Sequence, residues 1–133
     1  MNRKMTFFAR ALSGGRFEAS ASVAAWIASI HRGIDVARAV KCDVTAYADV
    51  DALVDAALGE FGRFDIMVNN AAWVRYQDLL EITPEVLDRM LEIGFKSVIW
   101  GMQAAAERMA DGQGGCIVNV ASVAGLRSPR RAV

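Results

Sequence analysis

The chain has 133 residues, of which 15 are basic and 15 acidic, so its formal net charge is zero. A chain of this length supports one hydrophobic core, and we expect residues 1–133 to form a single domain. No basic cluster is interleaved with aromatic side chains, and charged residues interrupt every apolar run before it reaches the ~18 residues of a membrane span. We therefore expect neither a nucleic-acid nor a membrane partner.

The amino-terminal segment bears on the cellular location, and the cysteine and histidine residues bear on disulfide and metal binding. The apolar stretch Met5–Ala9 is too short for the core of a signal peptide, which favours a cytoplasmic location. Cys42 and Cys116 lie in strand-like apolar segments, where we expect reduced, buried thiols. Because His31 is the only histidine and no ligand spacing is present, no metal site is expected.

Strand-like and helix-period segments alternate along the chain, a pattern typical of βαβ units. The expected strands are Lys4–Arg10, Val36–Val44, Phe64–Asn69 and Cys116–Val120. The uninterrupted apolar run Ile66-Met67-Val68 is typical of a strand covered on both faces, and we likewise expect the apolar strand Cys116–Val120 to be central. The predicted fold class is α/β, a three-layer, doubly wound parallel sheet of about four strands.

Helical periodicity is present in three further segments. They are about Phe17–His31, then Val50–Phe61, and a long segment from Pro84 to about Met109. Gly62 is placed to end the second helix, and Thr83 to cap the third. The expected apolar stripe of the long helix consists of Leu87, Met90, Leu91, Phe95, Val98, Met102 and Ala105.

Polar motifs follow three of the four expected strands, where ligands bind in doubly wound sheets. They are Cys42-Asp43-Val44, Asn69-Asn70-Ala71-Ala72 and Asn119-Val120-Ala121-Ser122. In type, order and spacing, these motifs resemble the short-chain dehydrogenase/reductase family, from about Met5 to Pro129. We expect Asp43, Asn69 and Ser122 to lie at one edge of the sheet.

The resemblance implies a Rossmann-like domain that transfers hydride between NAD(P) and a small carbonyl or alcohol, as 3-oxoacyl reductases and sugar or alcohol dehydrogenases do. By the same resemblance, Asp43 accepts the adenine amino group beside the Val44 backbone. Asn69 and the backbone of Asn70–Ala72 border the ribose. Ser122 is the catalytic serine that holds the substrate oxygen, although a serine in this place also suits a purely local hydrogen bond.

Arg10 would lie just past the family's second strand, where a basic residue often accompanies the 2′-phosphate of NADP. This position gives a weak preference for NADP. An arginine that ends a strand is equally consistent with a solvated side chain, so both interpretations remain open.

The sequence also departs from the family pattern. Ala72 replaces a glycine of the motif, and Gly94 stands where the family has a catalytic asparagine. The chain has neither the Gly-rich phosphate turn nor a Tyr-x-x-x-Lys pair. We therefore expect an incomplete Rossmann-like domain that binds cofactor weakly, if at all, and is inactive alone.

A second hypothesis comes from a different functional class. A truncated Rossmann core could serve as a non-catalytic interaction module, and the long helix Pro84 to Met109 could join copies of the chain into a homo-oligomer. Trp100, Met102 and Met109 are the expected contact residues on that helix.

Overall fold

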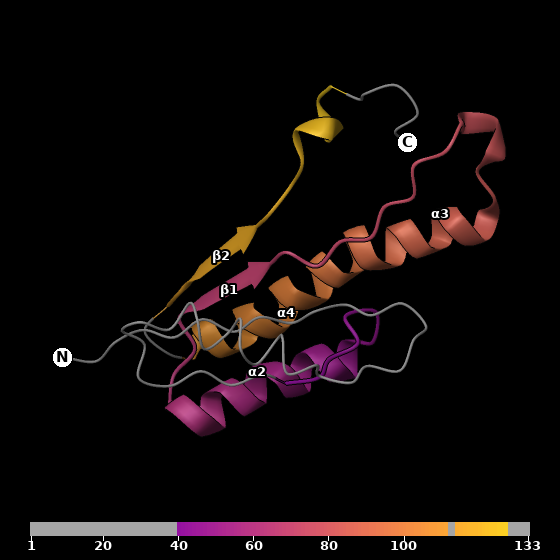
Figure 1. Cartoon of the computed structure of the whole chain (residues 1–133). Coiled ribbons are helices and arrows are strands. Elements are labelled where there is room, and N and C mark those ends of the chain that lie inside the picture. The colour runs from indigo at the N-terminus through magenta and orange to yellow at the C-terminus, as the bar shows by residue number, and fades with distance from the viewer. Residues whose placement is uncertain (1–39, 112–113, 128–133) are drawn as a thin grey trace, which may run out of the picture.

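The structure is a computed structural model that describes residues 40–111 and 114–127 (Figure 1). The expected strand Lys4–Arg10 and helix Phe17–His31 lie outside the described residues. The elements are α2 (Tyr47–Phe61), β1 (Ile66–Asn69), η1 (Leu79–Glu81), α3 (Pro84–Leu91), the π-turn η2 (Glu92–Lys96), α4 (Ser97–Ala110), β2 (Cys116–Asn119) and η3 (Val123–Gly125).

The two strands form a parallel sheet in which Ile66 pairs with Cys116 and Asn69 with Asn119. Both were expected, and each is shorter than expected at one end: β1 at its start and β2 at its finish. The expected strand Val36–Val44 is wrong for its described part, because residues 40–44 form no strand. Cys42 and Val44 are nevertheless buried, which explains their strand-like apolar pattern.

Helix α2 confirms the clearest helical periodicity of the sequence. Val50, Leu53, Val54 and Ala57 are its buried residues, at steps of three and four. Gly62 ends the helix as expected, with a φ of 69°, and its N–H donates to the carbonyl of Leu58. This left-handed conformation costs glycine little, because glycine has no Cβ.

The long helix expected from Pro84 to Met109 forms, but the π-turn η2 interrupts it between α3 and α4 (Figure 1). Thr83 caps it, accepting a hydrogen bond from the N–H of Val86 at 3.4 Å. A π-turn adds a residue to the helical turn and so rotates the inward face. The buried residues of this helix include four with small side chains, and all seven are Val86, Ile93, Ser97, Gly101, Ala104, Ala105 and Met109.

The expected apolar stripe is wrong at three of its seven positions, while Met90, Val98 and Met102 are half-buried. Leu87, Leu91 and Phe95 are exposed, whereas Ala105 is buried as expected. Of the three expected contact residues, Met109 is wrong because it is buried. Trp100 and Met102 are half-buried, and Trp100 packs against the core and against the ring of Tyr47. The helix instead presents its small side chains to the sheet, which allows a close approach.

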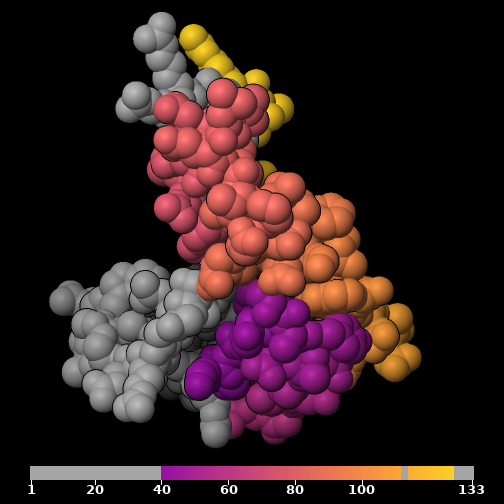
Figure 2. All heavy atoms as spheres, turned by 90° about the vertical axis from the view of Figure 1, so that its right-hand side faces the viewer, coloured from indigo at the N-terminus to yellow at the C-terminus, as the bar shows by residue number. Residues whose placement is uncertain are grey.

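The described elements stack in the order sheet, α4, α2 (Figure 1). Figure 2 shows α2 and α4 in direct contact. The core cluster joins α2 to the segment before it and to the long helix, through Cys42, Val44, Val50, Leu53, Val54, Ile93 and Ala104. The α/β class with a parallel Rossmann-like sheet is confirmed, with two of its strands among the described residues.

The sheet face that points away from α4 has no helix over it within the described residues. Ile66, Cys116, Val118 and Val120 are exposed. The expectation that Cys116–Val120 is covered on both faces, with a buried thiol, is therefore wrong for this part of the chain. Among the described helices, none is both long and apolar enough to cross a lipid bilayer.

Candidate functional site

The carboxyl ends of β1 and β2 lie side by side. Asn69 is in register with Asn119, and the N–H of Val120 donates to the carbonyl of Asn69 at 2.9 Å. Beyond this point the two segments diverge, one toward η3 and the other along the long helix toward η1 (Figure 1). Because the strands are parallel, Asn69 and Ser122 follow the same edge of the sheet, as the sequence predicts.

The side chain of Asn69 is turned toward α4. Its Nδ2 donates to Oδ1 of Asn119 at 2.8 Å, and Nδ2 of Asn119 lies 3.5 Å from the sulfur of Met102. Gly101 of α4 lies against the same amide group. Sequence reasoning named Asn119 as part of the motif that ends in Ser122 but assigned it no contact, and it missed Gly101, although a glycine inside a helix was a visible signal.

Asp43 shapes the turn that leads into α2. Its Oδ1 accepts hydrogen bonds from the N–H of Thr45 at 3.0 Å and from the Thr45 hydroxyl at 2.8 Å. The Asp43 N–H in turn donates to Oδ2 of Asp49 at 2.9 Å. Asp43 is exposed, and a carboxylate can accept about four hydrogen bonds, so these local bonds leave capacity for a ligand donor.

A small cavity of about 30 Å³ links the Asp43 turn to the end of β1. Its lining comprises Cys42, Val44, Val50, Leu53, Ser97 and Met67 to Ala71. The structure thus brings Val44 together with Asn69, Asn70 and Ala71, which the resemblance assigns to one cofactor. Ala72 follows directly along the chain and is exposed, whereas Arg10 lies outside the described residues.

Cys42 lines this cavity, and the deprotonated thiolate form of its side chain is strongly disfavoured. Burial, followed by the negative charges of Asp49 and Asp43, raises the pKa of Cys42 from 9.0 to about 11. Desolvation and nearby anions both penalise the charged form, so the thiol is protonated at neutral pH. Cys42 is therefore a packing residue of the site and no nucleophile.

Ser122 is exposed and caps the turn η3. Its Oγ accepts a hydrogen bond from the N–H of Ala124 at 3.1 Å. The local role that sequence reasoning left open is thus present. The role is compatible with substrate binding, because a hydroxyl that accepts one hydrogen bond still has a proton to donate.

Gly94 lies in the π-turn η2 and is exposed. Three residues later, the buried Ser97 donates its hydroxyl proton to the carbonyl of Ile93 at 2.6 Å, which satisfies an acceptor in the turn. Ser97 therefore stabilises the irregular segment beside the cavity. Sequence reasoning missed this role, although a serine within a helix commonly donates to the carbonyl four residues earlier.

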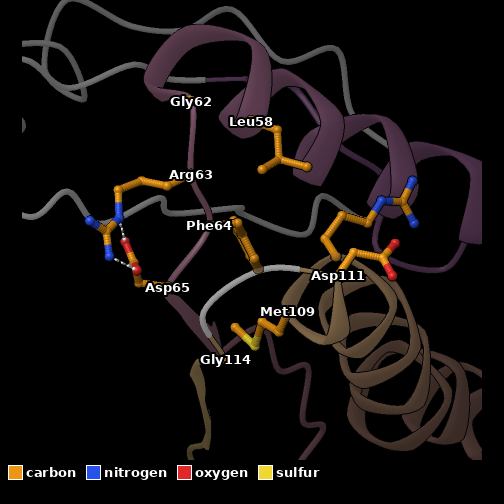
Figure 3. A pocket seen from close by; sticks show the side chains of 9 residues that line it. Leu58, Gly62, Arg63, Phe64, Asp65, Met109, Asp111 and Gly114 are labelled. Atoms are coloured by element: carbon orange, nitrogen blue, oxygen red, sulfur yellow. Dashed lines mark hydrogen bonds and ion pairs between the residues drawn. The ribbon is translucent and has the colours of Figure 1, made fainter.

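A larger cavity, of about 490 Å³, lies at the opposite end of the sheet, between the carboxyl ends of α2 and α4 (Figure 3). Arg63 and Asp65 on its wall form an ion pair with each other (Figure 3). Arg108 is paired with Asp51 and Asp55 of α2. Within residues 40–111 and 114–127, no group of acidic, histidine or cysteine side chains could hold a metal ion.

The comparisons with known proteins agree with this arrangement. The family model of the short chain dehydrogenases matches residues 16–133. Galactitol 2-dehydrogenase of Agrobacterium fabrum is 45% identical over 92 residues, which cover 68% of this chain and 36% of that enzyme. A short chain dehydrogenase structure from Mycobacterium smegmatis is 34% identical with a TM-score of 0.76, over 84% of this chain and 46% of that one.

Two further structural neighbours were solved with a nicotinamide cofactor. An NAD⁺-bound xylitol dehydrogenase is 29% identical with a TM-score of 0.67, over 71% of this chain and 37% of that one. ElxO with NADP bound is 26% identical with a TM-score of 0.66, over 71% of this chain and 39% of that one.

A parallel sheet with polar motifs beyond its carboxyl edge is typical of dinucleotide-binding oxidoreductases. The chain belongs to the short chain dehydrogenase family. It spans 38% of the length of the first curated relatives that it matches, so the activity of a complete enzyme is a matter for proposal.

Proposed function

We propose that this chain carries the adenine and ribose side, together with the substrate serine, of an NAD(P)-dependent oxidoreductase site. The observation that carries the proposal is the shared cavity of Val44, Asn69, Asn70 and Ala71 at the edge that Ser122 also follows. A bound nicotinamide cofactor would supply the hydride. The exposed Asp43 carboxylate fits an adenine amino group, because it can accept another hydrogen bond.

In this proposal, the residues of the chain bind and orient the cofactor and the substrate, while the cofactor supplies the group that reacts. Asp43 accepts from the adenine while the Val44 backbone lies alongside. Asn69 and the backbone of Asn70–Ala72 border the ribose. The Ser122 hydroxyl donates to the substrate oxygen, where negative charge develops during hydride transfer, and keeps its bond with Ala124.

The substrate class is a small carbonyl or alcohol, of the 3-oxoacyl or the sugar and alcohol type. The similarity to galactitol 2-dehydrogenase supports the second type. For the cofactor, Arg10 gives a weak preference for NADP, while the neighbours bind NAD⁺ in one case and NADP in another. We propose NAD(P) without assigning one of the two.

We also propose that the 133 residues do not turn over substrate by themselves. They contain no Gly-rich phosphate turn at the family's spacing and no lysine four residues after Tyr47 or Tyr76. Charge-assisted contacts to a pyrophosphate are worth ~1.5–3 kcal/mol each, so the adenine and ribose contacts alone should bind weakly. The glycine at position 94 further weakens the proton relay.

The experiment is a saturation-transfer NMR titration of the purified chain with NADH and NADPH, a method suited to weak binding. Asp43→Asn keeps an oxygen that can accept from Thr45 but replaces the other oxygen by a donor, which opposes the adenine amino group. We expect at least about a tenfold loss of affinity, or ~1.4 kcal/mol.

Asp88→Asn on α3 is the matched control, with the same chemical change on a surface helix far along the chain from this turn. It should leave the affinity unchanged. Equal losses in both variants, or a parent chain that gives no signal with either cofactor, would refute the proposal.

The second candidate, a homo-oligomerising interaction module, is favoured by the exposed side of the long helix. Leu87, Leu91 and Phe95 are 48%, 46% and 62% exposed, and the first two are one helical turn apart. Exposed apolar side chains that line up on one helix are typical of a contact surface. The proposed contact surface lies within the expected range Pro84 to Met109, although on other residues than expected.

Sedimentation velocity separates this candidate from a monomeric enzyme fragment. We expect Leu91→Glu to dissociate a self-associated chain, because an unpaired charge would be buried in the contact. Leu80→Glu, at a 98% exposed position in η1, is the control and should not. A parent chain that is monomeric at all accessible concentrations would exclude the oligomer.

A further inference from the structure

We propose that the cavity of about 490 Å³ at the amino ends of β1 and β2 is a binding site for a small organic cation, an ammonium group on an apolar stem or ring. The cavity lies at the opposite end of the sheet from Asn69, so the inference goes beyond the proposed function and does not depend on it. Its volume falls within the ~300–1,000 Å³ that is typical of small-molecule pockets.

Apolar side chains from three segments form the middle of the cavity. Leu58 comes from the last turn of α2, Phe64 from the segment that leads into β1, and Met109 from the last turn of α4. Figure 3 shows these side chains with the Arg63–Asp65 pair to one side of them. Met109 is buried and the other two are half-buried, so they offer a preformed apolar surface to the stem of a ligand. The face of the Phe64 ring also attracts a cation.

The carboxyl ends of two helices border the cavity. α2 ends at Phe61 and α4 at Ala110, and the residues that follow them, Gly62 and Asp111, belong to the lining. The last carbonyl groups of a helix lack partners within the helix and carry a partial negative charge, which attracts a cation. The last turn of α2 contains no basic residue, and that of α4 contains only Arg108.

Both arginines of the lining are already engaged by carboxylates. Arg63 donates through Nε to Oδ2 of Asp65 at 2.7 Å and through Nη2 to the other oxygen. The guanidinium nitrogens of Arg108 lie 2.6–2.9 Å from oxygens of three carboxylates, those of Asp51, Asp55 and Glu107. The carboxylate of Asp111 has no hydrogen bond or ion pair among residues 40–111 and 114–127. Two arginines are thus matched by five carboxylates, which leaves a surplus of negative charge.

This combination of charge and apolar surface selects one ligand chemistry. An anion would meet the surplus negative charge, and it could bind an arginine only by displacing a carboxylate that is already there. A neutral apolar molecule would contact Leu58, Phe64 and Met109 but gain nothing from Asp111. An ammonium group can donate to Asp111 and to the helix carbonyls while its stem covers the apolar side chains.

The test uses three ligands that share a phenyl ring and a short chain but differ in charge. Phenethylamine is a cation at neutral pH, phenethyl alcohol is the neutral control, and hydrocinnamate is the anion. In amide NMR spectra of the ¹⁵N-labelled chain, we expect the amine to shift the backbone N–H signals of residues 58–65 and 108–111. Its affinity should be roughly millimolar, as is usual for so small a ligand. The alcohol should bind more weakly, and the anion should not bind.

Asp111→Asn replaces the unpaired carboxylate with a neutral group of similar shape. It should weaken binding of the amine about two- to fivefold, the range for an exposed ion pair, and leave the affinity for the alcohol unchanged. Asp88→Asn on α3 is the matched control, because Asp88 is not part of the lining, and it should change neither affinity. Added salt should weaken binding of the amine more than binding of the alcohol.

An alcohol or an anion that binds as tightly as the amine would overturn the inference, and so would an Asp111→Asn variant that keeps the parent affinity for the amine. A parent spectrum that the amine leaves unchanged, or in which only residues 43–45 and 69–72 respond, would do the same. Titrations with NADH and NADPH probe the opposite edge of the sheet. The cation site and the proposed function can therefore fail independently of each other.

Discussion

Arg108 at the end of α4 donates through both Nε and Nη2 to the same oxygen of Asp55 in α2, at 3.2 and 2.9 Å. Its Nη1 also lies 2.6 Å from Oδ1 of Asp51, one helical turn earlier. The hydrogen bonds with Asp51 and then Asp55 raise the pKa of Arg108, so the guanidinium is charged at any accessible pH. One side chain thereby joins α4 to α2.

We expect Arg108→Met to lower the free energy of unfolding by ~1 kcal/mol. Exposed ion pairs contribute ~0.2–1 kcal/mol each, and this side chain makes several while being only 18% exposed. Methionine keeps an apolar stem for packing, so the loss reports mainly on the charges. Urea unfolding at low and high salt measures it, and a loss that does not shrink with salt would contradict an ionic origin.

Gly62→Ala should destabilise the chain by ~1–2 kcal/mol, because the φ of 69° at the end of α2 places a Cβ in an unfavourable position. Gly62→Asn is the informative comparison, since asparagine tolerates the left-handed region better. Chemical denaturation of the two variants should show the smaller loss for asparagine. Equal losses would mean that the space around the residue, and not its backbone conformation, sets the cost.

The two cysteines should differ sharply in reactivity. Cys42 is buried with its pKa raised to about 11, whereas Cys116 is exposed. A rise of two pKa units lowers the thiolate fraction about 100-fold near neutral pH, and burial slows access further. Mass spectrometry after brief iodoacetamide treatment at pH 8 should find Cys116 modified first, and comparable rates at both residues would count against the buried site.

The same shift predicts a loss of stability at alkaline pH. The folded chain retains the Cys42 proton between its ordinary pKa of 9.0 and about 11, while the unfolded chain has released it. Stability from this group is therefore complete below pH 9 and falls as the pH rises toward 11. Cys42→Ala should flatten this part of the stability curve, which thermal unfolding over the alkaline range can measure.

The purified chain should show no oxidation of NADH or NADPH above background with small ketones, and no reduction of NAD⁺ or NADP⁺ with polyols. The physical reason is that Ser122 alone cannot supply a proton to the substrate oxygen, a task that the resemblance assigns to the tyrosine of the Tyr-x-x-x-Lys pair. The absorbance of the reduced cofactor provides the measurement. Turnover that Ser122→Ala abolishes would show that the chain is a complete catalyst after all.

Local sequence patterns predicted the structure correctly wherever the conformation of a segment depends on its own residues. The periodicity from Val50 to Phe61, the glycine at position 62 and the Thr83-Pro84 start all produced the expected helix ends, because propensity and capping act within one or two turns. The apolar runs that became β1 and β2 were equally legible, and with them the polar motifs that identified the family.

The tertiary structure decided which faces are inside and which polar groups are already engaged. Packing against α2 and the sheet selected the buried face of the long helix, where Leu91 is exposed and Met109 is buried. The bond from Asn69 to Asn119 joins residues 50 positions apart and depends on the strand register. Such pairings depend on contacts between distant segments, which no local pattern in the sequence encodes, whereas helix ends and strand propensity are set by neighbouring residues.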